Sequence, residues 1–314
     1  MSYYIFWNAC SNGHLKVAKL SICINPFINI SAKNNSAFRS ACSKGHLEVA
    51  RWLVNIKPSI NISAHNYQAF QSACSNGYLE VAQWLVESYP SVVNISLDNN
   101  SAFRSACSNG HLEVAQWLVK INTEIISVVV YNTAFMAACS NGKLEVAKWL
   151  VKIHPSAVNI SACADYAFNH TCSNGHLKVA KWLVESYPSA INISTLDEYE
   201  FSCICSNGHI DVAKWLVQIQ PSIINIPPCD DLAFRFACHY NRIEVAKWLV
   251  QIRPYYYILD LDQYHTKILN WKTRPIKEIK WLKRTVPVLA YNSKTVNIFH
   301  RLNCDIVRHI CEFV

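Results

Sequence analysis

The chain has 314 residues, of which 51% are hydrophobic and 16% are charged, with a formal net charge of +8. The apolar fraction is typical of a soluble protein. No apolar run approaches the ~18 residues that a membrane-spanning helix needs, so we expect no membrane span. The apolar segment 3–7 is short and lacks a basic flank, which argues against a signal peptide.

Residues 1–254 carry 19 basic and 16 acidic side chains, whereas residues 255–314 carry 10 and 5. The excess of basic side chains in residues 255–314 is too small to indicate a nucleic-acid-binding surface.

All seven glycines share one spacing, which indicates an internal repeat. They are Gly13, Gly45, Gly77, Gly110, Gly142, Gly175 and Gly208, and successive ones lie 32 or 33 residues apart. One further step reaches Asn241, and Asn tolerates the left-handed backbone better than other non-glycine residues. A period of this length is typical of an array of stacked supersecondary units. Because every glycine belongs to the repeat, none remains for a phosphate-binding loop or a dinucleotide fingerprint.

Three more residue types recur at fixed distances from the glycine position, which is position 0 of repeats 1 to 8. Cysteine occupies position −3 in all eight repeats, at Cys10, Cys42, Cys74, Cys107, Cys139, Cys172, Cys205 and Cys238. Tryptophan occupies position +7 in seven repeats, at Trp52, Trp84, Trp117, Trp149, Trp182, Trp215 and Trp248, and the first repeat has Leu20 there. Proline occupies position +13 in every repeat except the fourth, which has Thr123.

These positions predict the same elements, in the same order, in each repeat. In repeat 4, Ala, Phe and Cys at helical spacing predict a first helix within 101–109 that ends at a left-handed residue, Gly110. Apolar residues at +2, +4, +5, +8 and +9 predict a second helix directly afterwards. Proline then blocks that helix, and an extended Ile-Asn-Ile-Ser stretch and a polar loop lead to the next repeat. Since one helix pair cannot bury its apolar face alone, the pairs are expected to stack.

The second helix of repeat 4, His-Leu-Glu-Val-Ala-Gln-Trp-Leu-Val at 111–119, resembles the Gly-His-Leu-Glu-Val-Val-Lys-Leu-Leu-Leu segment of the ankyrin-repeat family. Phe103 stands at the family's first Leu. The family's Thr-Pro-Leu-His opening is replaced by Ser-Ala-Phe-Arg, and its Gly-Ala-Asp loop by Pro-Ser. The resemblance covers residues 1–254 and implies an all-α ankyrin-repeat solenoid of about eight helix-turn-helix units, followed by a helical C-terminal tail or cap at 255–314. The Cys, Trp and Pro pattern resembles ankyrin arrays of giant DNA viruses of amoebae, which implies a viral protein acting in its host.

The chain has fourteen cysteines, and the eight at position −3 are expected to be small buried hydrophobic residues that replace alanine. Adjacent stacked helices lie about 8–10 Å apart, too far for the ~7 Å Cα separation of a disulfide. No Cys-x-x-Cys pair is present to suggest a zinc site. Unpaired thiols fit a reducing compartment, so we expect a cytoplasmic protein, in the host cytoplasm if it is viral. The Asn-x-Ser sequences at Asn29, Asn61, Asn94, Asn159 and Asn192 are then repeat residues rather than glycan sites.

Histidine and tryptophan each recur at a fixed position of the repeats. Histidine occupies position +1 in five repeats, but Tyr78, Lys143 and Arg242 occupy it elsewhere, so we expect a packing role at the helix start rather than a metal site. The tryptophans are expected to be partly buried between repeats. The chain lacks the Gly-x-Ser-x-Gly, His-Glu-x-x-His and Walker patterns. We therefore expect no enzymatic activity, no cofactor and no metal.

The resemblance implies a protein-interaction scaffold that binds through a concave face. Side chains at position −6 and at the tips between repeats vary most, as a recognition surface requires, and Tyr and Arg are typical hot-spot residues. The predicted partner-binding residues are Arg39, Tyr67, Gln71, Asn99, Arg104, Tyr131, Tyr166, Tyr199 and Arg235. Acidic tips between residues 197 and 231 favour a basic or polar partner. We expect a monomer whose partner is another protein.

The last residues, Leu302 to Val314, resemble the opening of an F-box, Leu-Pro-x-Glu-Ile-x-x-x-Ile-x-x-Tyr-Leu, with Asn303 in place of the proline. The resemblance implies that Leu302, Ile306, Ile310 and Phe313 dock on a host ubiquitin-ligase adaptor while the array holds a substrate. A short apolar helix is also a common sequence, and the alternative is a cap on the last repeat with a solvated basic face at 272–284. The sequence leaves both interpretations open.

Overall fold

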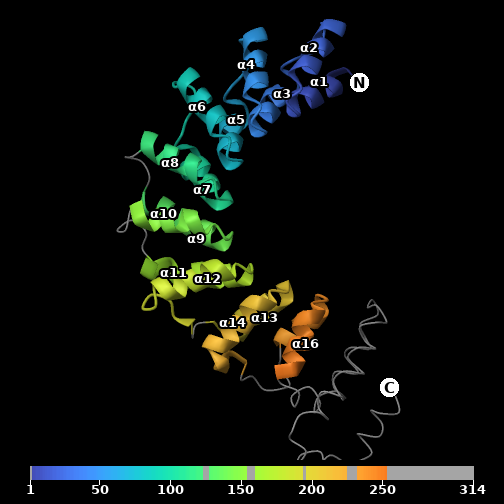
Figure 1. Cartoon of the computed structure of the whole chain (residues 1–314). Helices are drawn as coiled ribbons and strands as arrows, with labels where there is room; N and C mark the ends of the chain where they lie inside the picture. The colour runs from blue at the N-terminus through green and yellow to red at the C-terminus, as the bar shows by residue number, and fades with distance from the viewer. Residues whose placement is uncertain (1, 123–126, 154–159, 194–195, 225–231, 253–314) are drawn as a thin grey trace, which may run out of the picture. The chain divides into compact units, whose positions relative to one another are not determined.

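The computed structural model describes residues 2–122, 127–153, 160–193, 196–224 and 232–252. Within these ranges every regular element is a helix, so the all-α prediction is confirmed (Figure 1). No helix in the described ranges combines the length and the apolarity that crossing a bilayer would require. The predicted tail or cap at 255–314 lies outside the described residues.

Each repeat contributes one pair of α-helices. The pairs are α1 (Ser2–Ser11) and α2 (Leu15–Ile24), α3 (Ala32–Ser43) and α4 (Leu47–Ile56), α5 (Ala64–Ser75) and α6 (Leu79–Ser88), α7 (Leu97–Asn109) and α8 (Leu112–Ile121), α9 (Val128–Ser140) and α10 (Leu144–Ile153), α11 (Ile160–Ser173) and α12 (Leu177–Ser186), α13 (Glu198–Asn207) and α14 (Ile210–Ile219), and α15 (Leu232–His239) and α16 (Ile243–Ile252). A short 3-10 helix, η2 (Pro221–Ile224), follows α14. The chain divides into an N-terminal unit, residues 1–171 and 178–191, and a C-terminal unit, residues 172–177 and 192–314.

The first helices end at the predicted left-handed residues. The seven glycines have φ between 72° and 89°, and Asn241 has φ 57°. In repeat 2 the amide of His46 donates to the carbonyl of Ala41 at 2.8 Å, and the amide of Gly45 donates to that of Cys42 at 3.2 Å. This pair of bonds is the Schellman motif, which satisfies carbonyl groups left over at a helix end. Position −3 is therefore an acceptor through its backbone as well as a core side chain.

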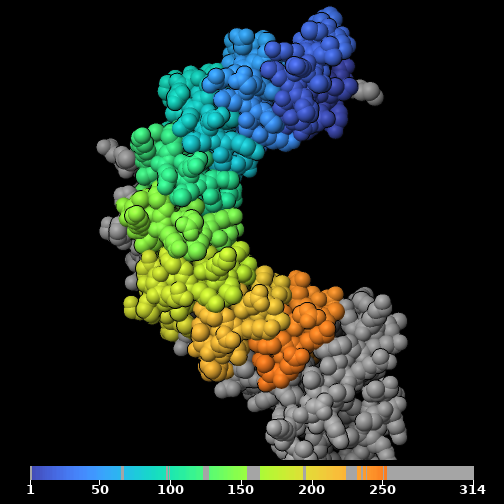
Figure 2. Space-filling view, in the orientation of Figure 1, coloured from blue at the N-terminus to red at the C-terminus, as the bar shows by residue number. Residues whose placement is uncertain are grey.

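The core of the N-terminal unit is built from equivalent positions of successive repeats. In repeat 2, Phe38, Ala41 and Cys42 on α3 and Val49, Ala50 and Leu53 on α4 are at most 1% exposed. The described cysteines at position −3 are fully buried, so the interpretation of these residues as small hydrophobes is confirmed. Burial raises the pKa of the Cys10 thiol to about 12, because the thiolate would lose its hydration. Neighbouring first helices of this unit pack side by side, and the space-filling view shows consecutive pairs pressed together (Figure 2).

In repeats 2 to 6 the tryptophan of the second helix packs against the preceding repeat. The ring centroids of Trp52 and Phe6 are 6.4 Å apart. The same contact, with centroids 6.4–6.5 Å apart, recurs between Phe38 and Trp84, Phe70 and Trp117, Phe103 and Trp149, and Phe135 and Trp182. These tilted or edge-on pairs are favourable aromatic arrangements. Each tryptophan is half-buried, so the predicted burial between repeats is confirmed in the N-terminal unit.

The predicted extended Ile-Asn-Ile-Ser stretch is wrong in the three repeats where it is best described. Residues 62–63 form a turn that leads into α5. Asn61 Oδ1 accepts hydrogen bonds from the amide of Ser63 at 3.0 Å and from its hydroxyl at 2.7 Å. The amides of Ser31 and Ser96 donate in the same way to Asn29 and Asn94. The Asn side chain replaces a backbone acceptor and bends the chain, which is why the stretch turns instead of extending.

Candidate interaction surface

The surface that changes most between repeats follows the first helices. We define the first-helix stripe as positions −9 and −6 of the N-terminal unit. It comprises Tyr4, Ser36, Gln68, Ser101, Thr133 and Tyr166 at −9, and Trp7, Arg39, Gln71, Arg104, Met136 and Asn169 at −6. All twelve side chains are exposed or half-buried, and only the two arginines are charged. The stripe is mainly hydroxyl, amide and aromatic, whereas charges lie on the second helices at positions such as Glu48 and Arg51.

Side chains at −6 also connect neighbouring helices. Trp7 Nε1 donates to Ser40 Oγ at 3.1 Å. Arg39 donates to Gln68 Oε1, and Gln71 Nε2 donates to Ser101 Oγ at 2.9 Å. Two predicted partner-binding residues, Arg39 and Gln71, therefore have a structural role between repeats in addition to any role in recognition.

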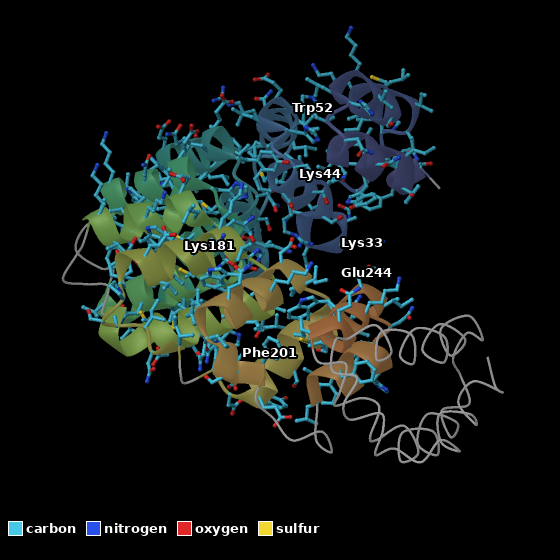
Figure 3. All side chains as sticks on the ribbon, turned by 60° about the horizontal axis from the view of Figure 1, so that its bottom comes forward. Lys33, Lys44, Trp52, Lys181, Phe201 and Glu244 are labelled. Carbon is cyan, nitrogen blue, oxygen red and sulfur yellow. The ribbon has the colours of Figure 1, made fainter. Side chains whose placement is uncertain are left out.

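The starts of α3, α5 and α7 contain left-handed residues that are not glycine. Lys33, Asn34 and Asn35 have φ from 52° to 59°, and Tyr67, Asp98 and Asn100 have φ from 50° to 60°. Such backbone costs about 1–3 kcal/mol per residue and is concentrated at functional sites in known proteins. The polar tips were predicted to be loops between the repeats, and this prediction is wrong. These residues lie within the first turns of the helices, with Lys33 at the start of α3 (Figure 3).

Two of the predicted arginines stabilise these strained starts. Arg39 Nε donates to the carbonyl of Asn34 at 2.9 Å, and its Nη2 donates to that of Lys33 at 3.1 Å. Arg104 Nη2 donates to the carbonyl of Asp98 at 3.0 Å. The guanidinium group suits this task because its donors form a planar fork and stay charged. The Nε of Arg104 and the Oδ1 of Asn35 are buried without a hydrogen-bond partner.

The predicted tyrosines have different environments. Tyr166 is 55% exposed, with its ring centroid 4.1 Å from that of His170, and Tyr199 in the C-terminal unit is 60% exposed. Tyr67 is half-buried. Tyr131 is a correction, because it is only 3% exposed and packs edge-on against Phe103 at 5.8 Å. Its helix, α9, begins with a regular turn that Ser127 caps, whereas α3 has left-handed residues at the same place and its equivalent residue, Asn34, is exposed.

Six other predicted residues cannot be placed as side chains. The side chains of Asn99 and Arg235 lie outside the described set, although both residues belong to helices, α7 and α15. The four possible adaptor-docking residues, Leu302, Ile306, Ile310 and Phe313, also lie outside the described residues.

The acidic tip of the C-terminal unit is engaged in helix capping. Asp197 Oδ1 accepts hydrogen bonds from the amides of Tyr199 at 2.7 Å and Glu200 at 3.1 Å, which caps α13. A hydrogen bond between the two carboxyl groups lowers the pKa of Asp197 and raises that of Glu200. Glu198 Oε1 accepts from the amide of Leu232, at the start of α15, at 3.3 Å. Because these carboxylates already accept hydrogen bonds from backbone amides of their own unit, they give less support to the prediction of a basic partner.

At the C-terminal ends of the first helices, hydrogen bonds between neighbouring repeats form a ladder that was not predicted from the sequence. Asn76 Nδ2, at position −1, donates to the carbonyl of Ser43, at position −2 of the preceding repeat, at 2.9 Å. Asn109 repeats this contact with Ser75 at 2.6 Å, and Asn207 repeats it with Ser173 at 2.8 Å. In repeat 2, Lys44 Nζ donates instead to Asn12 Oδ1 at 3.3 Å (Figure 3). The recurring Ser-Asn-Gly triplet was the available signal.

The side chain at +1 packs over the glycine of the preceding repeat, as predicted. A Cβ placed on Gly77 would lie 2.4 Å from His111 Nδ1, and one on Gly45 would lie 2.3 Å from Tyr78 Cδ1. Partial burial is the main cause of the lowered pKa of His46 and of His209. Within the described ranges, no three His, Cys, Asp or Glu side chains are grouped as metal ligands. His46, His111 and His209 therefore pack against the glycine of the preceding repeat.

The repeated helix pairs have counterparts among known proteins. A family model described as ankyrin repeats (3 copies) matches residues 6–99, 64–128 and 103–197. The crystal structure of the human ASB11 ankyrin repeat domain is similar at 18% sequence identity and a TM-score of 0.42, covering 57% of this chain and 82% of that one. No curated protein matches the sequence. Because the family model matches more than half of the chain, the chain belongs to the ankyrin-repeat family.

Proposed function

We propose that the chain is a non-enzymatic scaffold that holds a protein partner on the first-helix stripe. Ankyrin repeats are protein–protein interaction modules, and nothing in the described residues indicates catalysis. One observation carries the choice of surface. Positions −9 and −6 are exposed or half-buried throughout the N-terminal unit and differ in chemistry between repeats, whereas the packed positions between them are nearly identical. Variation over a constant scaffold is what specific recognition requires.

The chemistry of the stripe also limits the partner. Hydroxyl, amide and aromatic groups predominate, and the two arginines already bond to carbonyl groups of their own helix starts. We therefore propose a partner whose contact surface is uncharged and rich in hydrogen-bonding groups. Tyr166 is the leading anchor, because an exposed aromatic side chain covers a large area with little loss of conformational entropy.

Affinity capture from eukaryotic cells with quantitative mass spectrometry tests this function. The wild-type chain is compared with Tyr166→Ala and with Lys181→Ala, a control in the same repeat whose exposed lysine lies on α12 (Figure 3). The proposal expects a protein that is lost with Tyr166→Ala and retained with Lys181→Ala. Equal capture by all three, with Arg104→Ala and Gln68→Ala also silent, would contradict the assignment of the stripe.

A second candidate function rests on the F-box-like sequence. In this version the array holds a substrate while Leu302, Ile306, Ile310 and Phe313 recruit a ubiquitin-ligase adaptor of a host cell. Capture with residues 1–314 is compared with capture by residues 1–300. Loss of ligase subunits on truncation supports the adaptor, whereas identical partners exclude it and leave the tail as a cap.

The proposed location is a reducing cytoplasm, that of the host if the protein is viral. Support comes from the cysteines at position −3, which are fully buried where the structure describes them and serve as core side chains. A fluorescent fusion expressed in eukaryotic cells would show diffuse cytoplasmic signal. Retention in the secretory pathway would contradict this location.

A further inference from the structure

We propose that the outer surface of the first helix pair binds a second copy of the chain. This end face consists of Tyr4 and Ile5 on α1 and Val17, Leu20 and Ile24 on α2. The pair lies at one end of the N-terminal unit, coloured blue in Figure 2. All five side chains are apolar or aromatic, and they are 46–76% exposed.

The end face is continuous in register with the interfaces between repeats. Valine at position +4 is 1–2% exposed in repeats 2 to 8, as Val49 and Val245 illustrate, but Val17 is 46% exposed. At position −8 the second repeat has Ala37, which is fully buried, whereas the first repeat has Ile5, which is 51% exposed. Positions +4 and −8, which are buried at these interior contacts, are thus open here. Exposed terminal faces of repeat arrays are normally polar, because an apolar one favours association.

One feature favours a second copy over another repeat stacked in the interior manner. Ile5 fills the space that alanine leaves free inside the array, so a repeat at interior spacing would be overpacked.

The face also meets the requirement for two identical surfaces to join. A two-fold contact joins the same patch on both copies, so that residue i of one copy meets residue j of the other, and like charges on the patch would face one another and repel. The only charged side chains in residues 2–32 are Lys16 and Lys19. They occupy positions +3 and +6, which are solvent-exposed in repeat 2 as well, at Glu48 and Arg51. Both lysines lie outside the end face, and the chain is a dimer through it rather than the monomer that the sequence predicts.

Sedimentation equilibrium of the full chain tests this proposal, from roughly 1 to 100 µM, because dimerisation follows mass action. A reducing agent keeps the exposed Cys23 from cross-linking the copies. We expect the mean mass to rise from 35.7 kDa towards twice that value. Ile24→Glu and Leu20→Glu should each raise the dimer dissociation constant by about ten-fold or more. Circular dichroism verifies that each variant stays helical.

Ile121→Glu is the matched control. It changes the same +11 position in an interior repeat, where the side chain is 39% exposed, and should leave the dimer unchanged. A constant mass of 35.7 kDa at every concentration would overturn the proposal. A dimer that both Ile24→Glu and Leu20→Glu leave intact would overturn it equally, because the copies would then meet elsewhere.

Discussion

The first helices of this ankyrin array end in nearly identical ways but begin in different ways. At their C-terminal ends a left-handed glycine, a Schellman motif, a side chain from the next repeat and a Ser–Asn hydrogen bond recur. At their N-terminal starts, α3 has three left-handed residues, α9 is capped by Ser127 and α13 is capped by Asp197. The glycine end sets the spacing between repeats, so it tolerates little change. The starts are free to vary, and the proposed recognition residues lie beside them.

The largest effect is expected where the aromatic ladder crosses between repeats. Phe103→Ala removes a ring that is 2% exposed and lies 6.5 Å from Trp149 and 5.8 Å from Tyr131. The free energy of unfolding should fall by about 3–5 kcal/mol, as for other buried Phe→Ala changes. Urea unfolding measures this loss. Phe27→Ala, at a side chain that is 95% exposed, should leave the midpoint unchanged.

A smaller loss is expected at the glycine end. Gly77→Ala must hold φ +82° and place its Cβ 2.4 Å from His111 Nδ1. The left-handed backbone alone destabilises an L-residue by about 1–2 kcal/mol. Adding His111→Ala should recover only the part due to overlap, which a double-mutant cycle in urea isolates. At Asn241, whose φ is 57°, the reverse change to glycine should stabilise the protein slightly. Destabilisation by Asn241→Gly would contradict the shared role of these positions.

At the helix starts the expected loss is smaller still. Arg39→Ala removes hydrogen bonds to the carbonyls of Lys33 and Asn34 and to Gln68. Since the arginine is half-buried, the loss should be about 1 kcal/mol. Lys19→Ala, an exposed residue on α2 for which no such bonds are observed, serves as the control. If the two variants unfold at the same urea concentration, Arg39 does not stabilise the strained start.

The smallest effect concerns pH. His46 and His209 have lowered pKa values in the folded state, mainly because of burial. The unfolded chain then binds protons more readily, so stability is complete above the unfolded pKa near 6.5 and falls as pH drops through the folded values. Thermal unfolding between about pH 5 and 7.5 should show this decline. His46→Gln together with His209→Gln should flatten it, and an unchanged slope would contradict the assignment.

The features that could be predicted from the sequence are those that recur from repeat to repeat. Glycine at position 0, cysteine at −3 and tryptophan at +7 each have the same physical role in the repeats of the N-terminal unit that carry them, so burial and left-handed backbone could be inferred from recurrence alone. The starts of the first helices do not recur. The left-handed Lys33 and Asn34 depend on Arg39, and burial of Tyr131 depends on where α9 begins. Such features depend on single contacts, which no spacing rule contains.

The most direct test of the recognition surface is hydrogen exchange of the full chain, with and without a partner obtained by capture. Amides at helix starts exchange quickly when nothing covers them, so binding is visible there. We predict that new protection is concentrated in the first helices of the N-terminal unit, between residues 32 and 43, 64 and 75, 97 and 109, and 160 and 173, the last of which contains Tyr166. Protection confined to the second helices, such as 47–56 and 79–88, would contradict recognition through the first-helix stripe.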